Sequence, residues 1–204
     1  MLSYETIEPH TLELLRALTQ LPTLAGTRLV GGTSLALQYG HRNSVDLDFF
    51  GTDIAIDEIQ LRNEIDTVGN VRVISETKNI KCYTIDNIKI DIVIYNYPWI
   101  SDMIEQDGLR LASPEDIGAM KINAIEGRGT KKDFIDLYFL LQHYSIEEIL
   151  DFYKKKYPEH SIFRAMRSLV YFEDAEIQAM PKMFKPVSWE EMKHYIYNVC
   201  TNLI

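Results

Sequence analysis

Residues 31–50 read GGTSLALQYGHRNSVDLDFF, and this stretch carries the strongest chemical pattern in the chain. Asp46 and Asp48 stand two apart in an alternating segment, residues 45–50, that predicts a β-strand, so both carboxylates point to one face. The residues predicted to face the core are Val45, Leu47 and Phe49. Two aligned carboxylates repel each other unless a cation or a proton relieves the repulsion. The pattern therefore predicts a metal site, which Mg²⁺ (or Mn²⁺) would fill together with substrate phosphates.

A glycine pair, Gly31-Gly32, precedes a predicted helix over residues 34–39. Glycines let backbone N–H groups approach a phosphate, and the N-terminus of a helix favours an anion. Taken alone, a glycine pair is usually just a turn. Its place directly before an Asp-x-Asp strand is what indicates a phosphate-binding turn.

Asp91 is the third candidate catalytic acid. It lies in the predicted strand IKIDIVIY, residues 88–95, between Ile90 and Ile92, where an unpaired carboxylate is costly to bury. From a neighbouring strand it can complete the metal site and accept the proton of an incoming hydroxyl. The alternative is that Asp91 caps the end of a strand or pairs with Lys89.

Two helices carry a second group of charged residues. Lys121 and Arg128 are seven apart, about two helical turns, so they share a face that suits a triphosphate. Asp133 and Asp136, three apart on the next helix, either orient these cations or bond the ribose or base. The alternatives are a solvated Lys121, an Arg128 paired with Glu126 or Asp136, and two surface acids.

The turn before the acidic strand adds two candidate nucleotide-binding residues, Arg42 and Ser44. Arg42 either contacts the nucleotide or neutralises Asp46 or Asp48. Ser44 either starts the strand or, two residues before Asp46, lies near the metal. His41 is interpreted as a hydrogen-bonding residue that stabilises the loop.

The order of elements predicts an α/β (α+β) protein with a small mixed-sheet lobe, residues 1–110, followed by a helical lobe, residues 111–204. Predicted strands cover residues 27–30, 45–50, 71–75, 81–85 and 88–95; predicted helices cover 8–21, 34–39, 57–67, 161–173 and 188–203. Asp86-Asn87 is a plausible tight turn. Lys154-Lys155-Lys156 is interpreted as a solvated helix end, with an RNA-facing patch as the alternative.

Composition excludes several classes of protein. The 204 residues carry a formal charge of −9, so a broad basic face for duplex nucleic acid is not expected and any nucleic-acid contact must be local. Cys82 and Cys200 are far apart and carry no zinc or disulfide motif. No apolar run approaches the roughly 20 residues of a membrane helix. We expect a cytoplasmic protein.

Four motifs resemble the AbiEii/AbiGii nucleotidyltransferase toxin family, which has the polymerase-beta-like nucleotidyltransferase fold. They are GG-T-S, H-R-x-S-x-D-L-D-F-F, K-x-x-A-x-x-x-R and K-D-F-x-D-L, between Gly31 and Leu137. The resemblance implies magnesium, a nucleoside triphosphate donor, a tRNA acceptor and a separately encoded antitoxin. By that likeness Asp46 and Asp48 bind metal and Lys121 grips phosphate. The residues it implies for the phosphate-contacting turn are Gly32, Thr33 and Ser34.

The leading hypothesis is metal-dependent transfer of a nucleoside monophosphate to an acceptor hydroxyl, on tRNA, in a toxin–antitoxin or phage-defence setting. Transfer to a small molecule or a protein uses the same donor chemistry, and the acidic net charge favours it. A non-catalytic interaction protein with the same fold and a metal-dependent hydrolase are the other hypotheses.

Overall fold

The computed structural model describes residues 1–52 and 56–203, and the chain forms two compact units. The first comprises Met1–Gly40, Ser44–Pro98 and Asp102–Ser113; the second comprises His41–Asn43, Trp99–Ser101 and Pro114–Ile204. The long part of the second unit begins at Pro114, three residues after the start of the predicted helical lobe at residue 111. The two short segments of the second unit within the first 110 residues were not predicted.

The first unit is built on a mixed sheet of seven strands among its described residues, in the order β3-β4-β5-β2-β1-β7-β6. The strands are β1 (Arg28–Leu29), β2 (Leu47–Gly51), β3 (Val71–Glu76), β4 (Ile80–Ile85), β5 (Ile88–Ile94), β6 (Ile104–Gln106) and β7 (Leu109–Leu111). Strand β2 runs parallel to β5 and antiparallel to β1. The acidic strand is thus near the centre of the sheet and has a partner on each side.

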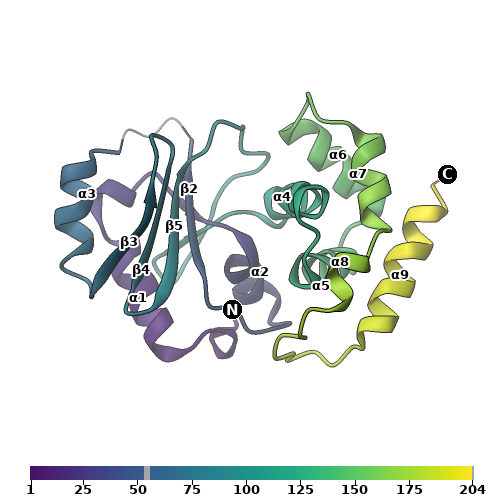
Figure 1. Ribbon diagram of the computed structural model, residues 1–204, viewed down its shortest axis with the longest axis horizontal. Helices are drawn as coiled ribbons and strands as arrows, with labels where there is room; N and C mark the ends of the chain where they lie inside the picture. The colour runs from purple at the N-terminus through teal and green to yellow at the C-terminus, as the bar shows by residue number, and fades with distance from the viewer. Residues whose placement is uncertain (53–55, 204) are drawn as a thin grey trace. The chain divides into compact units, whose positions relative to one another are not determined.

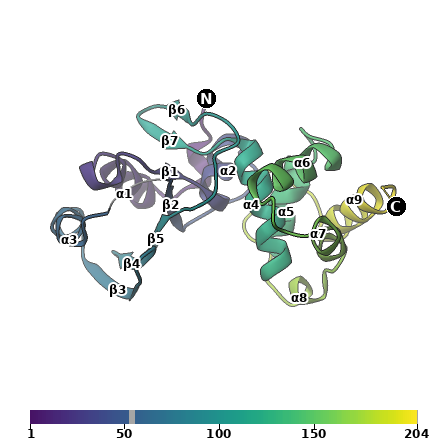
Figure 2. The ribbon, with the colours of Figure 1, turned by 90° about the horizontal axis from the view of Figure 1, so that it is seen from above.

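Three α-helices cover this sheet: α1 (Pro9–Thr19), α2 (Gly31–Tyr39) and α3 (Glu58–Ile65). Two short 3₁₀ turns, η1 (Tyr4–Thr6) and η2 (Pro22–Leu24), flank α1. Figure 2 shows α1 and α3 on one face of the sheet and α2 on the other. The core between sheet and helices includes Leu15, Leu18, Leu47, Phe49, Ile90 and Ile92. Burying alternate residues of β2 and β5 leaves the residues between them on the opposite face.

Two details of the first unit differ from the prediction. Val45 is 40% exposed, because β2 begins at Leu47 and only Leu47 and Phe49 reach the core. The β6–β7 hairpin was not predicted, since strands of three residues are too short for an alternating pattern to be recognised. The predicted turn at Asp86-Asn87 is confirmed: both residues have positive φ, 50° and 68°, as a two-residue hairpin requires.

The second unit is built of helices (Figure 1), with one isolated β-bridge among its described residues, between Arg42 and Met183. Its helices are α4 (Pro114–Gly127), α5 (Lys131–Leu140), α6 (Ile146–Lys156), α7 (Ile162–Leu169), α8 (Glu173–Glu176) and α9 (Trp189–Thr201). Helix α4 packs against α5, α6 and α7. Gly129, with φ +50°, lies in the turn from α4 to α5, and a capping box at Ser145 begins α6.

The interpretation of the lysine run is wrong for one of its members. Lys156 is fully buried, with its Nζ 2.7 Å from Asp116 Oδ1 and 4.6 Å from the centre of the Trp99 ring. The backbone N–H groups of Ile100 and Ser101 also donate to Asp116, which is itself fully buried. Lys156 therefore belongs to the interior of the second unit rather than to a basic surface.

Candidate functional site

Asp48 and Asp91 are paired in register across the parallel strands β2 and β5. Their neighbours in the same register, Leu47 with Ile90 and Phe49 with Ile92, are buried in the core. The two aspartates therefore lie on the face of the sheet opposite the core, on neighbouring strands about 4.8 Å apart. The structure brings together two of the three predicted acids.

Asp46, the third acid, lies just before β2 and is held through its backbone. The Thr33 hydroxyl bonds the Asp46 carbonyl oxygen and lies 2.8 Å from Ser44 Oγ. Ser44 is in turn fixed by its N–H, which donates to the Thr6 carbonyl at 3.0 Å. The Thr33 and Ser44 side chains thus position the acidic segment.

The three carboxylates act on one cation, the Lys89 ammonium. Lys89 Nζ donates to Asp91 Oδ2, so the predicted alternative pairing is present. Burial lowers the pKa of Lys89, but the hydrogen bond and charge of Asp91, with the charges of Asp48 and Asp46, raise it above its ordinary value overall. The electrostatic influence of all three acids thus converges on the position of this ammonium.

Asp91 Oδ1 is buried and has no hydrogen-bond partner among the described residues. A buried carboxylate oxygen without a partner is costly, and a divalent cation satisfies such an oxygen. Within residues 1–52 and 56–203, no three His, Cys, Asp or Glu side chains stand close enough to hold a metal as they are placed. The carboxylates fit Mg²⁺ in chemical type but are not gathered around one point, and Lys89 bonds one oxygen of Asp91.

Helix α2 begins at Gly31 itself, so the glycine pair forms its first turn rather than preceding it. Gly31 has φ +69°, and a Cβ on Gly31 would lie 2.5 Å from Asp48 Oδ2. The N-cap residue, Val30, makes no side-chain capping bond among the described residues. The first backbone N–H groups of α2 therefore begin beside the Asp48 carboxylate, with no partner inside the helix.

The side chains of Thr33 and Ser34 are engaged inside the first unit. Both are buried, and the Ser34 hydroxyl accepts a hydrogen bond from Gln38 Nε2 at 3.1 Å. The Ser34 N–H donates to the Val30 carbonyl at 3.4 Å, so the prediction of a phosphate contact depends on the backbone N–H groups of Gly32 and Thr33.

The second unit contains a buried charge cluster centred on Asp136. Arg42 donates to both Asp136 oxygens, from Nε at 2.7 Å and from Nη2 at 2.8 Å. Lys121 Nζ lies 2.6 Å from Asp136 Oδ2, and His41 Nε2 lies 2.8 Å from Asp136 Oδ1. The structure thus gives Arg42 the Asp136 carboxylate as its partner, where the sequence suggested Asp46 or Asp48.

Asp133 extends the same cluster. It accepts from Lys121 Nζ at 3.0 Å, from Arg128 Nε at 2.9 Å and from the Thr130 hydroxyl at 2.6 Å. Lys121 is therefore held between Asp133 and Asp136, the first of the two roles that the sequence suggests for these acids. Arg128 pairs with Asp133 rather than with Glu126 or Asp136, and its side chain is 65% exposed.

The pKa directions within the cluster follow from these contacts. Burial raises the pKa values of Asp133 and Asp136, but the Lys121, Arg42 and Arg128 charges outweigh burial and hold both below the ordinary value. Burial lowers the pKa of His41, so its ring is neutral at pH 7. Three cations then face two carboxylates, which leaves one net positive charge at the cluster.

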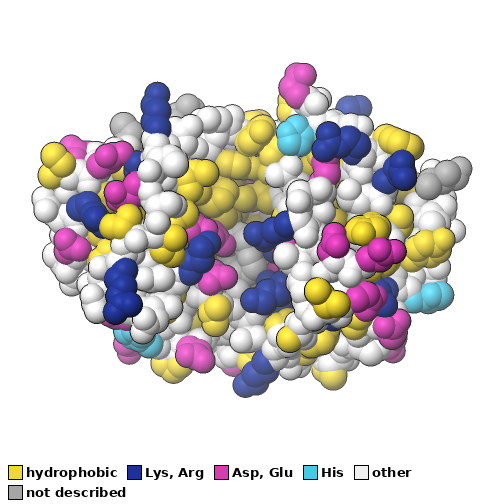
Figure 3. Space-filling model, in the orientation of Figure 1, with side chains coloured by type: hydrophobic (Ala, Val, Ile, Leu, Met, Phe, Trp, Pro, Cys, Tyr) yellow, Lys and Arg dark blue, Asp and Glu magenta, His cyan; other side chains and the backbone are white. Residues whose placement is uncertain are grey.

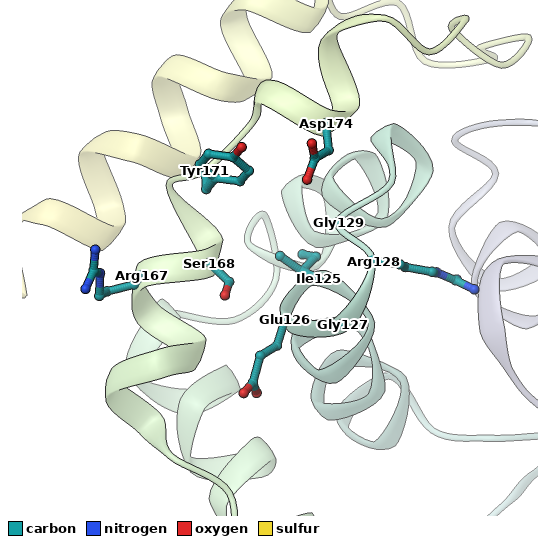
Figure 4. Close-up of a pocket in the computed structure, with 9 residues that line it drawn as sticks. All are labelled: Ile125, Glu126, Gly127, Arg128, Gly129, Arg167, Ser168, Tyr171 and Asp174. Atoms are coloured by element: carbon teal, nitrogen blue, oxygen red, sulfur yellow. The ribbon is translucent and has the colours of Figure 1, made fainter.

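Arg128 extends from the C-terminal end of α4, away from Tyr171 and Asp174 (Figure 4). These two residues line a cavity of about 350 Å³ beside α4. Figure 3 shows acidic and basic side chains interspersed over the visible face. Over residues 1–52 and 56–203, no helix has both the length and the apolar character needed to cross a bilayer.

Comparisons with known proteins agree with this architecture. Residues 13–194 match the family described as nucleotidyl transferase AbiEii toxin, type IV TA system. An uncharacterized protein of Aquifex aeolicus (strain VF5) is 36% identical over 172 residues, 82% of each chain.

Two crystal structures from Helicobacter pylori share the fold. One, described as a nucleotidyltransferase, is 22% identical with a TM-score of 0.61 and covers 95% of this chain and 91% of its own. The other, JHP933, is 20% identical with a TM-score of 0.60 and covers 97% and 93%. The family match spans most of the sequence and contains both groups of candidate residues, and the chain therefore belongs to the AbiEii nucleotidyl transferase toxin family of type IV toxin–antitoxin systems and is a nucleotidyltransferase.

Proposed function

We propose that this nucleotidyltransferase moves a nucleoside monophosphate from a nucleoside triphosphate to a hydroxyl of tRNA, in a magnesium-dependent reaction at Asp46, Asp48 and Asp91. One observation carries the proposal. Asp48 stands beside the first turn of α2 and in register with Asp91, and one buried Asp91 oxygen has no partner among the described residues. This arrangement suits a divalent cation that is bound by the carboxylates and by the phosphates of the substrate.

The carboxylates of Asp46, Asp48 and Asp91 would hold Mg²⁺ or Mn²⁺. When bound, the ion supplies positive charge that neutralises the donor phosphates. The Lys89 side chain is 47% exposed, so its ammonium can turn into solvent and release Asp91. The first turn of α2 offers the backbone N–H groups of Gly31, Gly32 and Thr33 to the phosphates, which supports the turn from Gly31 to Ser34 as the phosphate-contacting segment.

The proposed transfer is a single displacement of pyrophosphate at the α-phosphorus of the nucleoside triphosphate. The acceptor hydroxyl oxygen forms a bond to the α-phosphorus, and the bond from that phosphorus to the oxygen bridging to the β-phosphate breaks. Pyrophosphate leaves with the bonding electron pair. The hydroxyl proton passes to Asp91 Oδ2, the oxygen that Lys89 releases.

The charge cluster of the second unit has a supporting role in this proposal. Lys121, Arg42 and Arg128 all bond carboxylates, but Lys121 and Arg42 are buried whereas the Arg128 side chain is 65% exposed. Arg128 is therefore the residue that we assign to a phosphate contact. Asp133 and Asp136 position Lys121 and Arg128, and Ser44 positions the acidic segment through Thr33.

The family description, type IV TA system, supports a toxin–antitoxin setting for the enzyme. We assign to it a separately encoded antitoxin as partner and the cytoplasm, where tRNA is found, as its location. Acceptor identity is the point at which the sequence offers a competitor, because a formal charge of −9 also suits a small-molecule or protein hydroxyl.

Transfer of label tests the proposal. Purified protein is incubated with magnesium, each α-³²P-labelled nucleoside triphosphate and total tRNA, and the products are separated on a denaturing gel. We expect one nucleotide to label tRNA when the enzyme is the wild type. The same labelling is expected with the control variant Asp107→Asn, which changes an aspartate in the β6–β7 hairpin. Asp48→Asn and Asp91→Asn are expected to give no labelled tRNA. Labelled tRNA with either variant, or label in protein or a small molecule instead of tRNA, contradicts the proposal.

A further inference from the structure

A cavity of about 340 Å³ lies inside the first unit, where the first turn of α1 meets the β4–β5 turn. Asp46 and Lys89 form part of its lining, so it adjoins the proposed catalytic acids. Glu8, His10 and Thr11 line it from α1, and Asp86 lines it from the turn. The volume is at the lower end of the range of small-ligand sites, about 300–1,000 Å³.

The charges of this cavity disfavour phosphate. Glu8, Asp46 and Asp86 contribute carboxylates, while the Lys89 ammonium is bonded to Asp91. His10 Nε2 lies 3.2 Å from Asp86 Oδ2, so the imidazole is also directed to a carboxylate. A phosphate placed here would face three like charges, whereas a neutral hydroxyl would find acceptors for its proton.

The same cavity also offers hydrogen-bond donors. Thr11 is only 3% exposed and lines the cavity, and its side chain carries a hydroxyl that can donate. Thr11 also lies in the first turn of α1, where backbone N–H groups have no partner within the helix. A pair of neighbouring hydroxyls on a sugar can both donate and accept hydrogen bonds. Such a pair would satisfy the carboxylate acceptors and the hydrogen-bond donors of the cavity together.

The cavity is separate from the glycine turn. Of the described residues that form the lining, Asp46 is shared with the acid group, whereas Gly31 and Asp48 are not among them. In phosphoryl transfer the attacking and leaving oxygens lie roughly in line on opposite sides of the phosphorus. A donor at the glycine turn and an acceptor in this cavity would therefore reach the acids from two different sides.

We infer that this cavity is the acceptor subsite and binds the hydroxyl-bearing terminal sugar of the acceptor, leaving the acceptor phosphates outside. Asp86 accepts from the sugar hydroxyls and Thr11 donates to them. Val45, which is 40% exposed, and Ile88 give the sugar an apolar wall. The inference rests on the proposed role of Asp46 at the reacting centre.

Nuclear magnetic resonance of the full ¹⁵N-labelled chain tests the inference, with adenosine and 2′,3′-dideoxyadenosine as probes. We expect adenosine to shift the amides of Thr11, Asn87 and Ile88, and dideoxyadenosine to bind at least about tenfold more weakly, because hydrogen bonds to charged groups are lost. Thr11→Val and Asp86→Asn are each expected to weaken the binding of adenosine about tenfold. Asp107→Asn, another positive-φ hairpin aspartate, serves as the control.

Equal binding of the two nucleosides, or cavity amides that respond to inorganic phosphate and not to adenosine, overturns the subsite. Magnesium–ATP, added separately, tests the proposed function through the amides of Gly32 and Thr33. A response there without any response of the cavity amides to adenosine overturns the subsite and leaves the proposed function standing. Weakened adenosine binding in Thr11→Val with an unchanged magnesium–ATP response supports the subsite.

Discussion

Gly31 and Asp48 are in such close approach that a single methyl group at position 31 would lie 2.5 Å from Asp48 Oδ2. Gly31 also has φ +69°, a conformation that costs other residues about 1–2 kcal/mol. The glycine thus serves two purposes: it starts α2 and lets its backbone reach the carboxylate. This relationship joins the proposed phosphate-binding turn to the proposed metal-binding acid.

Gly31→Ala is expected to abolish label transfer and to lower the free energy of unfolding by about 1–2 kcal/mol or more. Gly108→Ala is the matched control, because Gly108 has φ +78° but a Cβ there meets no atom within 4 Å. It should lose similar stability and keep its activity. Urea unfolding and the transfer assay measure both quantities. Full activity in Gly31→Ala would show that the close approach is unimportant.

Asp136→Asn is expected to destabilise the protein by about 3–5 kcal/mol, because Lys121 and Arg42 would lose the charge that compensates them in a buried site. Asp133→Asn should cost less, since Lys121 keeps Asp136 and Arg128 is 65% exposed. Denaturant unfolding of the two variants gives the comparison. A larger loss in Asp133→Asn would mean that the cluster is not centred on Asp136.

Lys156→Met is expected to cost about 3–5 kcal/mol of unfolding free energy, because it leaves the buried Asp116 without its cation. Lys155→Met, one residue away on the exposed surface, should stay within about 0.5 kcal/mol of the wild type. Thermal and urea unfolding distinguish the two. Equal, small effects would return Lys156 to the solvated helix end that the sequence suggests.

The buried His41 is expected to make the free energy of unfolding depend on pH. Its pKa is lowered from the ordinary 6.5 by burial, against the opposing influence of Asp136 and with Arg42 and Lys121 nearby. Because the folded state binds this proton less readily than the unfolded state does, the stability that the neutral ring contributes is present above pH 6.5 and falls as the pH drops below it. The loss is at most about 1.4 kcal/mol per pH unit.

Urea unfolding at pH 7.5 and at pH 5.5 measures this dependence. The lowered pKa values of Asp133 and Asp136 act at lower pH, below the ordinary 3.8 of an aspartate, so they leave this window undisturbed. His41→Gln should reduce the difference between the two pH values, while the exposed His143→Gln should not. If His41→Gln leaves the difference in unfolding free energy between pH 7.5 and pH 5.5 unchanged, the pH dependence comes from other groups.

Much of the fold follows from local patterns in the sequence. The alternation of Leu47 and Phe49, the Asp86-Asn87 turn and the helices of the second unit are all short-range features, and the structure contains each of them. The β6–β7 hairpin was missed because its strands are three residues long. Family resemblance correctly indicated a nucleotidyltransferase and its two-part architecture of mixed sheet and helices.

Contacts between distant residues could not be predicted in the same way. Arg42 and Asp136 are 94 residues apart, and Asp116 and Lys156 are 40 apart, so no periodicity pairs them. A basic run such as Lys154–Lys156 gives no sign that one member is buried. The cavity beside Asp46 likewise brings α1 and the β4–β5 turn together, and neither segment carries a motif.

Thermal unfolding with each nucleoside triphosphate, with and without magnesium, shows whether a nucleotide binds only together with the ion. A ligand at 100 times its dissociation constant stabilises the native state by about 2.7 kcal/mol, which corresponds to about 5–10 °C for a chain of this size. We predict such a shift for one nucleotide only when magnesium is present, and its loss in Asp48→Asn but not in Asp107→Asn. A shift that needs no magnesium, or that survives in Asp48→Asn, would contradict the account.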